Sequence, residues 1–413
     1  MSLEPEELKR RRQHRKAQQR LARKRLILRL CIAAAVLLLC GIVIAVIALR
    51  PQQGTTASTE PPQVSQPAEN PTTVIHFTAA GDLNVTENLV ASGGASYDYS
   101  QTFLDVAHLL ADADLATVNL EGNLCGAPYG STASAPQSMM EALSRAGVDM
   151  IQLANSYAIN RGVSGLLDTI DGVRQAGMEP VGVFRDQQDY EQRKGFTMFE
   201  VEGIRIAVVS FTKGMDGTTL PPGSENCVNV LYSDYDSIYQ KVNKDKINTV
   251  MAAVNQAQPD ITIALLHWGS EFNDTISSSQ KSITRLLQES GVDAIIGTHP
   301  HYVHQINFDP EAGTLVAYSL GDFAGDAARA GSEYSIILDL EITKDHTTGQ
   351  TAITGYNHTP IFTVAEEGKP IRVVRIHEAM TAFEAGYMDA VNQQTYDAMQ
   401  YALTRIKARI AGQ

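Results

Sequence analysis

From residue 74 onward, short apolar runs alternate with segments that have apolar residues at helical spacing. The runs are nearly continuous, which is typical of strands buried on both faces of a sheet. The predicted strands are 74–80, 115–120, 148–154, 180–184, 205–211, 261–266 and 292–297. The predicted helices are 101–112, 136–146, 163–176, 244–257 and 277–290. This alternation predicts an α/β fold built on a largely parallel sheet.

The pattern changes after residue 300, where polar and apolar residues alternate over short distances. The segments "HQINFD", "GTLVAYSL", "EYSIILDLEIT" and "ITGYNHTPIFTV" predict antiparallel strands. Residues 385–410 have apolar residues at helical spacing and predict a docking helix. We therefore predict one globular domain over residues 74–365 and a helical C-terminal extension over 366–413.

The N-terminal part of the chain predicts a membrane anchor. Residues 1–29 hold 11 Lys and Arg against three Glu, a net charge of 11 − 3 = +8. Residues 30–49 lack any charge and match the roughly 20 residues that a transmembrane helix needs. The positive-inside rule places the basic tail in the cytoplasm and the rest of the chain outside. A cleaved signal peptide is the alternative, but its apolar region is usually only about 7–15 residues long.

Residues 50–73 are rich in Pro, Gln, Ser and Thr and predict an extended linker. Residues 51–413 carry 21 Lys and Arg against 43 Asp and Glu, or 21 − 43 = −22. The basic tail lies beside an apolar span, so membrane topology explains it better than nucleic-acid binding does. Cys125 and Cys227 lie where a disulfide is permitted, and the sequence leaves their pairing open.

Polar residues that bind metals follow five of the apolar runs. They are Asp82, Asn119 and Glu121, Asn155, His267, and His299 with His301. Ligands of open α/β sheets bind at the carboxyl ends of the strands, so these side chains are expected to converge. Carboxylates, amides and imidazoles together suit Mn, Fe, Zn or Mg.

Each of these residues also has an ordinary structural interpretation. A single Asp after a strand is usually a turn or capping residue, and His267 could be a core histidine. Their recurrence at one edge of the sheet favours the metal site. We interpret His304 as structural and Lys213 as a solvated loop residue, with contact to an anionic substrate as the alternative for Lys213. Phosphate-loop and GxSxG motifs are absent from the sequence.

Six motifs follow one another between residues 75 and 325: "AAGDL", "NLEGNL", "LANSYAINRG", "LLHWGSEF", "IIGTHPHYVHQ" and "YSLGDF". In this order they resemble the CapA family of bacterial capsule and poly-γ-glutamate synthesis proteins. The resemblance implies a fold similar to calcineurin-like metallophosphoesterases. That fold is a two-sheet sandwich flanked by helices, with metal bound at the strand ends.

The resemblance also implies roles for individual residues. Asp82 and Glu121 would be carboxylate ligands of the metal. His267, His299 and His301 would be imidazole ligands. Asn119 and Glu271 match family positions and would orient the ligands.

The chain departs from the family where the usual Asn-Asn-His is replaced by Asn155, Ser156 and Tyr157. Tyr157 stands at the position of the catalytic histidine, and a phenol with an ordinary pKa of about 10 is a poor acid near neutrality. Asn155 and Ser156 are then candidates for orienting ligands or contacting substrate. Asp322 replaces a usual Asn, and Thr298 replaces the first His of the family's usual His-His-Pro-His motif.

We therefore expect a membrane-anchored, extracellular protein of capsule or poly-γ-glutamate biosynthesis or export, with a partly degenerate metal site. An active metal-dependent phosphoesterase and a metal-free binding module are the alternatives. The expected cofactor is a divalent metal, Mn, Fe, Zn or Mg, and the sequence leaves open whether two ions, one ion or none are bound. The expected partners are the membrane and other membrane-bound polymer-synthesis subunits, and no nucleic acid. An anionic cell-surface polymer is an alternative partner, because the charge of −22 disfavours its direct, tight binding.

Overall fold

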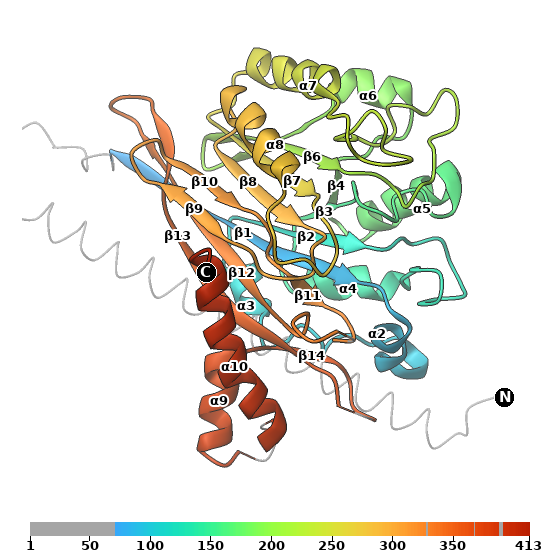
Figure 1. The fold of residues 1–413 in the computed structure, drawn as a ribbon, viewed down its shortest axis with the longest axis vertical. Coiled ribbons are helices and arrows are strands. Elements are labelled where there is room, and N and C mark those ends of the chain that lie inside the picture. The colour runs from blue at the N-terminus through green and yellow to red at the C-terminus, as the bar shows by residue number, and fades with distance from the viewer. Residues whose placement is uncertain (1–70, 328, 367, 388–390) are drawn as a thin grey trace, which may run out of the picture. The chain divides into compact units, whose positions relative to one another are not determined.

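A computed structural model describes residues 71–413 except 328, 367 and 388–390 (Figure 1). The predicted basic tail and membrane span, and the predicted linker up to residue 70, lie outside the described residues. Among the helices of the described part, none combines the length and apolar character that a membrane crossing requires.

The first sheet has the order β14-β13-β12-β1-β2-β3-β4, and β11 pairs with the end of β1. Its strands are β1 (Thr72–Asn84), β2 (Leu115–Glu121), β3 (Met150–Gln152), β4 (Glu179–Val181), β11 (Asp322–Ala324), β12 (Tyr334–Asp345), β13 (Thr351–Val364) and β14 (Arg372–Arg375). Strands β1 to β4 run parallel, whereas β12, β13 and β14 are antiparallel to their neighbours. Two of the predicted antiparallel segments, which form β12 and β13, therefore share this sheet with the predicted parallel strands β1 to β4.

The second sheet has the order β5-β6-β7-β8-β10-β9. Its strands are β5 (Thr197–Val201), β6 (Ile204–Thr212), β7 (Ile261–His267), β8 (Ala294–Thr298), β9 (Ile306–Asp309) and β10 (Thr314–Ala317). Strands β6, β7, β8 and β10 are parallel, and the two edge strands are antiparallel.

Helices flank both sheets (Figure 1). They are α2 (Glu87–Ser92), α3 (Ala107–Ala111), α4 (Gln137–Arg145), α5 (Gly162–Gln175), α6 (Gln187–Arg193), α7 (Lys244–Ala257), α8 (Ser278–Glu289), α9 (Ile376–Glu384) and α10 (Gln393–Ile410), with a short 3-10 turn, η1 (Gly94–Ser96). One core packs α4 and α5 on the first sheet, another packs α7 and α8 on the second, and a third lies between the sheets.

Side chains of a single strand alternate between two of these cores. In β7, Ile263 and Leu265 face the first sheet, whereas Ala264 and Leu266 face the helices. Both faces are covered, which is why the strands read as continuous apolar runs. The predicted α/β two-sheet sandwich flanked by helices is confirmed.

An aspartate immediately precedes each of four parallel strands. These are Asp114, Asp149, Asp260 and Asp293, before β2, β3, β7 and β8. Each carboxylate accepts a backbone N–H from the neighbouring strand at 2.7–2.8 Å, and each Asp donates its own N–H to the carbonyl of that same residue. The paired bonds satisfy backbone groups at the strand starts and align neighbouring strands there.

The predicted helix 101–112 is wrong over its first half, since only α3 is helical. The Thr102 carbonyl accepts the N–H of Val373 in β14, a long-range bond that competes with a local helical one. The predicted single helix 385–410 is also wrong. The chain turns at Gly386, whose φ is 72°, and α10 starts after Asn392, whose side chain accepts the Thr395 N–H.

Some element boundaries differ from the prediction. Strand β1 begins at Thr72, inside the predicted linker, and continues to Asn84. Strands β3 and β4 are short, with three residues each. The predicted C-terminal extension contains β14 as well as its helices.

Candidate functional site

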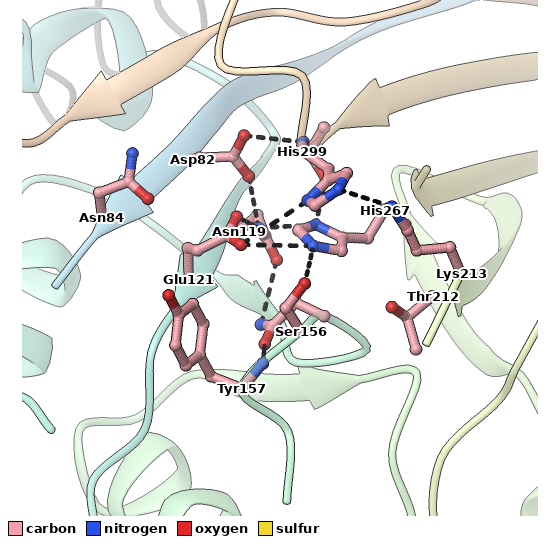
Figure 2. Close-up of polar contacts among 12 residues, drawn as sticks. Asp82, Asn84, Asn119, Glu121, Ser156, Tyr157, Thr212, Lys213, His267 and His299 are labelled. Atoms are coloured by element: carbon pink, nitrogen blue, oxygen red, sulfur yellow. Dashed lines mark hydrogen bonds and ion pairs between the residues drawn. The ribbon is translucent and has the colours of Figure 1, made fainter. Parts of the chain in front are cut away.

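The carboxyl ends of strands from both sheets meet at one buried polar cluster (Figure 2). In the first sheet, Asp82 lies opposite Asn119 of β2 and opposite Asp322 of β11. In the second sheet, His267 lies opposite Thr298, and His299 follows directly. Strand register therefore brings together residues far apart in the sequence.

Asp82 is held by hydrogen bonds on both carboxylate oxygens. Its Oδ1 accepts from the Asn119 side chain at 2.5 Å, and its Oδ2 accepts from the His299 backbone N–H at 2.8 Å. Burial, followed by the nearby Glu121 carboxylate, raises the pKa of Asp82 well above its ordinary value. A cation beside this carboxylate would relieve that penalty.

Glu121 and His267 form a second part of the cluster. The Glu121 Oε1 lies 3.4 Å from His267 Nε2 and 3.9 Å from His299 Nδ1. Burial alone would raise the pKa of Glu121, but His267, His299 and His301 hold it well below its ordinary value. The Nε2 of His267 also lies 3.1 Å from the Ser156 hydroxyl.

His301 pairs with Asp322 at the other side of the cluster. The distance from His301 Nδ1 to Asp322 Oδ1 is 2.8 Å, and the Asn84 amide nitrogen lies 3.3 Å from the same ring nitrogen. Burial opposes the charge on His301, but Asp322, Glu121 and Asp82 raise the pKa of His301 to about 10. Burial raises the pKa of Asp322 to about 6.

His299 is almost fully buried, and burial together with His267 lowers its pKa to about 3. Its Nε2 lies 3.2 Å from the Lys213 ammonium. Its Nδ1 has no hydrogen-bond partner among the described residues.

Two of the histidines have unusual backbone conformations. The φ angles are 92° for His299 and 59° for His301, in the region that favours glycine. Such conformations cost about 1–3 kcal/mol each and cluster at functional sites. Their persistence here supports a functional role for the His-Pro-His turn.

Close backbone approach also shapes the site. A Cβ at Gly81 would lie 1.8 Å from the carbonyl oxygen of Gly321, so only glycine fits there. The neighbouring Asp82 N–H donates to the same carbonyl at 3.0 Å. Gly81 thereby lets β1 approach the chain just before β11, next to Asp322.

The predicted residues 155–157 lie at the rim of the cluster. The Asn155 amide donates to the Asn119 side-chain oxygen at 3.3 Å, and its own oxygen accepts the Tyr157 N–H at 2.9 Å. Burial, followed by the carboxylates of Glu121, Asp216 and Glu271, raises the pKa of Tyr157 to about 12. The phenol therefore keeps its proton at neutral pH and is a poorer acid than free tyrosine.

Three groups of these side chains could each hold a metal ion, because their ligand atoms lie within 4.8 Å of one another. They are Glu121, His267 and His299; Glu271, His299 and His301; and Asp82, His301 and Asp322. All ligand atoms are nitrogen or oxygen, and all side chains except Glu271 are buried. This donor set fits a divalent ion such as Mn, Fe or Zn, and the carboxylates alone also suit Mg.

The structure brings every predicted site residue to this cluster or its rim. Glu271 is exposed, and it lies on the loop after β7 beside Phe272, whose ring stacks on His301 with 4.7 Å between centroids. Asp274 of the same loop pairs with Arg409 of α10 at 2.6 Å. His304 lies outside the cluster with its Nε2 on the Asn273 carbonyl at 2.8 Å, in accord with a structural role.

Asp322 and Lys213 are site residues that the predicted set lacked. Asp322 directly follows the "YSLG" run, as the predicted ligands follow their apolar runs, so the sequence contained a signal for Asp322. The solvated interpretation of Lys213 is wrong, since its ammonium is partly buried and contacts His299. Cys125 and Cys227 are both free thiols in the structure.

The sequence model of the family described as "Bacterial capsule synthesis protein PGA_cap" matches residues 76–327. The chain is 25% identical over 286 residues to "Capsule biosynthesis protein CapA" of Bacillus anthracis, covering 66% of this chain and 64% of that protein. It is 26% identical over 202 residues to "PGA biosynthesis protein CapA" of Bacillus subtilis, covering 48% of each. The matches thus span less than two thirds of either relative.

Among solved structures, the chain is similar to the calcineurin-like phosphoesterase YfkN of Bacillus subtilis, with a TM-score of 0.45 and 14% identity, covering 81% of this chain and 98% of that one. It is also similar to a phosphatase of Mycoplasma pneumoniae, with a TM-score of 0.43 and 13% identity, covering 70% and 94%.

Proposed function

Since the chain belongs to the bacterial capsule synthesis protein family PGA_cap, we propose that it serves the biosynthesis or export of a capsule or poly-γ-glutamate polymer at the cell surface. The observation that carries the proposal is the coincidence of the family match with the buried cluster of carboxylates and imidazoles. The family motifs and the cluster occupy the same strand ends. Two similar proteins bear names that refer to capsule and PGA biosynthesis.

We propose that the cluster binds a divalent metal ion. Asp82, His301 and Asp322 would hold it on one side, and Glu121, His267 and His299 offer ligands on the other. A bound ion would supply Lewis acidity toward a phosphoryl or carbonyl oxygen and would lower the pKa of a coordinated water. Asn119 would keep Asp82 and Glu121 oriented, because its amide donates toward both carboxylates.

The rim residues favour polymer handling over rapid turnover. The pKa of Tyr157, raised to about 12, makes its phenol too weak an acid to protonate a leaving group efficiently. Its phenol can instead donate a hydrogen bond to a bound group. The Ser156 hydroxyl lies 3.1 Å from His267 Nε2 and can orient that imidazole.

A metal-dependent phosphoesterase or related hydrolase is the second candidate. The buried ligands Asp82, Glu121, His267 and His299 favour it, since such a set is expensive to maintain without a cation. Hydrolysis of aryl phosphate mono- and diesters by the purified full chain, with Mn, Zn or Mg added, tests this candidate. Absence of turnover with every metal would contradict it.

The proposal includes a membrane anchor at residues 30–49 and an extracellular main domain. The net charge of −22 over residues 51–413 should repel a polyanion at long range. Contact with an anionic polymer would then need the metal ion or a partner subunit. Cell fractionation followed by protease treatment of intact cells tests the topology, and a main domain that stays protected would contradict it.

Gene deletion tests the cellular role. We expect less cell-surface polymer in the deletion strain, restoration by the wild-type chain, and poor restoration by a His299→Ala/His301→Ala variant present at equal abundance. Unchanged polymer after deletion would contradict the proposed function. Full restoration by the variant would retain the role in polymer assembly but remove the metal cluster from it.

A further inference from the structure

The loop between β7 and α8 carries the one exposed member of the three possible ligand groups. This member is Glu271, whose carboxylate lies within 4.8 Å of ligand nitrogens of His299 and His301. From Glu271 to Thr275 only Phe272 is partly buried, and the other side chains are exposed. This stretch therefore lacks the apolar burial that fixes the other possible ligands, and its position has to come from specific contacts.

Phe272 joins the loop to the His-Pro-His turn. Its φ angle is 51°, in the region that favours glycine, so the surrounding contacts must maintain this conformation. The Phe272 N–H donates to the Pro300 carbonyl at 3.0 Å, and the ring stacks on His301 with 4.7 Å between centroids. Glu271 directly precedes Phe272, so its reach toward the histidines depends on the loop keeping this conformation.

Helix α10 contacts the same loop two residues further on. Arg409 Nη2 lies 2.6 Å from Asp274 Oδ1, and the Arg405 guanidinium lies 3.9 Å from the other carboxylate oxygen. The Arg409 guanidinium carbon lies 4.5 Å from the ring centroid of Tyr302 and 5.6 Å from that of Tyr334. The Arg409 side chain is only 9% exposed, and a buried guanidinium is costly without an anionic partner. Asp274 is that partner, so the pair ties the loop to the helix.

The helix lies outside the part of the chain that the family model matches. That match ends at residue 327, whereas α10 spans Gln393–Ile410. The Asp274–Arg409 pair thus connects a loop of the matched region to an element that follows it in the sequence.

We propose that Arg409 is a positioning residue of the metal site: through Asp274 it holds the loop after β7 so that Glu271 can act as a ligand together with His299 and His301. The inference rests on the proposed metal binding. It gives the C-terminal helix a function at a site to which the helix contributes no ligand.

Hydrogen exchange of the loop tests whether Arg409 holds it. Arg409→Met keeps the apolar stem of the side chain and removes the guanidinium. The matched control is Arg193→Met, because Arg193 is also largely buried, pairs with Glu179 at 2.8 Å and lies over the ring of Phe184, with no contact to the cluster. In the metal-free full chain, purified in detergent, exchange in the peptide that contains Phe272 should be at least about ten-fold faster in Arg409→Met than in wild type, and unchanged in Arg193→Met.

Mn²⁺ affinity measured by calorimetry tests whether the loop acts through Glu271. We expect Arg409→Met and Glu271→Gln each to weaken Mn²⁺ binding about 10- to 100-fold, and Arg193→Met to stay within about two-fold of wild type. The double variant should bind no more weakly than Glu271→Gln alone, because the position of the loop ceases to matter once the carboxylate is lost. Asp274→Asn, at the exposed partner, serves as a second variant if thermal unfolding shows that Arg409→Met is misfolded.

The possible failures are distinguishable. Unchanged loop exchange in the folded variants, or faster exchange with unchanged Mn²⁺ affinity, would overturn the role of Arg409 and leave the proposed metal site intact. A double variant that loses the full effect of both single changes would show that Arg409 does not act through Glu271, and would overturn the proposal too. Absence of Mn²⁺ binding by the wild type would refute the proposed metal binding, and this inference with it.

Discussion

Asp293 should make the protein less stable at neutral pH than at pH 4. It immediately precedes β8, is partly buried, and accepts the Thr262 N–H at 2.7 Å. Burial raises the pKa of Asp293 from 3.8 to about 6, and the hydrogen bond from Thr262 only partly offsets that rise. Asp293→Asn keeps an oxygen that can accept the same N–H and removes the charge.

The sign follows from proton binding. Below about pH 3.8 the carboxyl is protonated in both the folded and the unfolded state, so it contributes no pH dependence. Between about pH 3.8 and 6 only the folded state keeps the proton, and the free energy of unfolding falls as the pH rises. Above about pH 6 the loss is complete and amounts to about 3 kcal/mol. Asp293→Asn should therefore gain up to about 3 kcal/mol over wild type at pH 7 and nothing at pH 3.5.

Asp260 is the matched control because it occupies the equivalent place before β7. Burial alone would raise the pKa of Asp260, but the Arg205 N–H and the Lys344 ammonium, at 2.9 Å, lower it instead. Its contribution to stability is present above its unfolded pKa and is lost as the pH falls through its lower folded pKa. Asp260→Asn should therefore destabilise the protein at pH 7.

Urea unfolding of the full chain, followed by the fluorescence of the buried Trp268, measures these effects between pH 3.5 and 8. The difference between Asp293→Asn and wild type is the decisive quantity, because other titrating groups cancel in it. A difference that stays constant with pH, or one that makes the variant less stable at pH 7 than at pH 4 relative to wild type, would refute the reasoning.

Three further predictions concern the cluster. Gly81→Ala should lower the free energy of unfolding by about 1–3 kcal/mol or more and reduce bound Mn²⁺, because the added Cβ would lie 1.8 Å from the Gly321 carbonyl oxygen. Thermal unfolding should show a far smaller effect for the control Gly355→Ala, whose Cβ would meet no atom closer than 3.9 Å. Asn119→Ala should weaken Mn²⁺ binding about 10- to 100-fold by calorimetry, and an unchanged affinity would show that the amide does not orient the ligands. Tyr157→Phe should leave any aryl-phosphate hydrolysis within about two-fold of wild type, whereas a loss of about 100-fold would identify the phenol as a general acid.

The strands of the parallel core could be predicted because burial on both faces leaves a continuous apolar run. Helix α7 matches the predicted helix 244–257, since its apolar residues recur at helical spacing and Asn243 caps its start. The helix prediction failed for residues 101–106 because a long-range hydrogen bond from Val373 competes with local helix formation. Local pattern carries no information about such a partner.

A residue of the candidate site could be predicted where it lies at the carboxyl end of an apolar strand. Asp82, Glu121, His267 and His299 all meet this condition. Lys213 also follows a strand, β6, but a lysine in that position is ordinarily solvated, and its contacts with Gly269 and His299 lie 56 and 86 residues away in the sequence. The position of Lys213 depends on how the second sheet is assembled.

The aspartates before the parallel strands fix the distance along each strand from its start to the cluster residue at its end. Asp114 to Glu121 and Asp260 to His267 are both spacings of seven residues, about 23 Å in extended chain. The start of each strand is fixed by the paired backbone hydrogen bonds of the aspartate, and the end of the strand carries a cluster residue. An insertion of one residue between them would move the far end by about 3.3 Å and turn its side chain to the opposite face. Length changes within this chain should therefore be tolerated in its loops and excluded between each aspartate and its ligand.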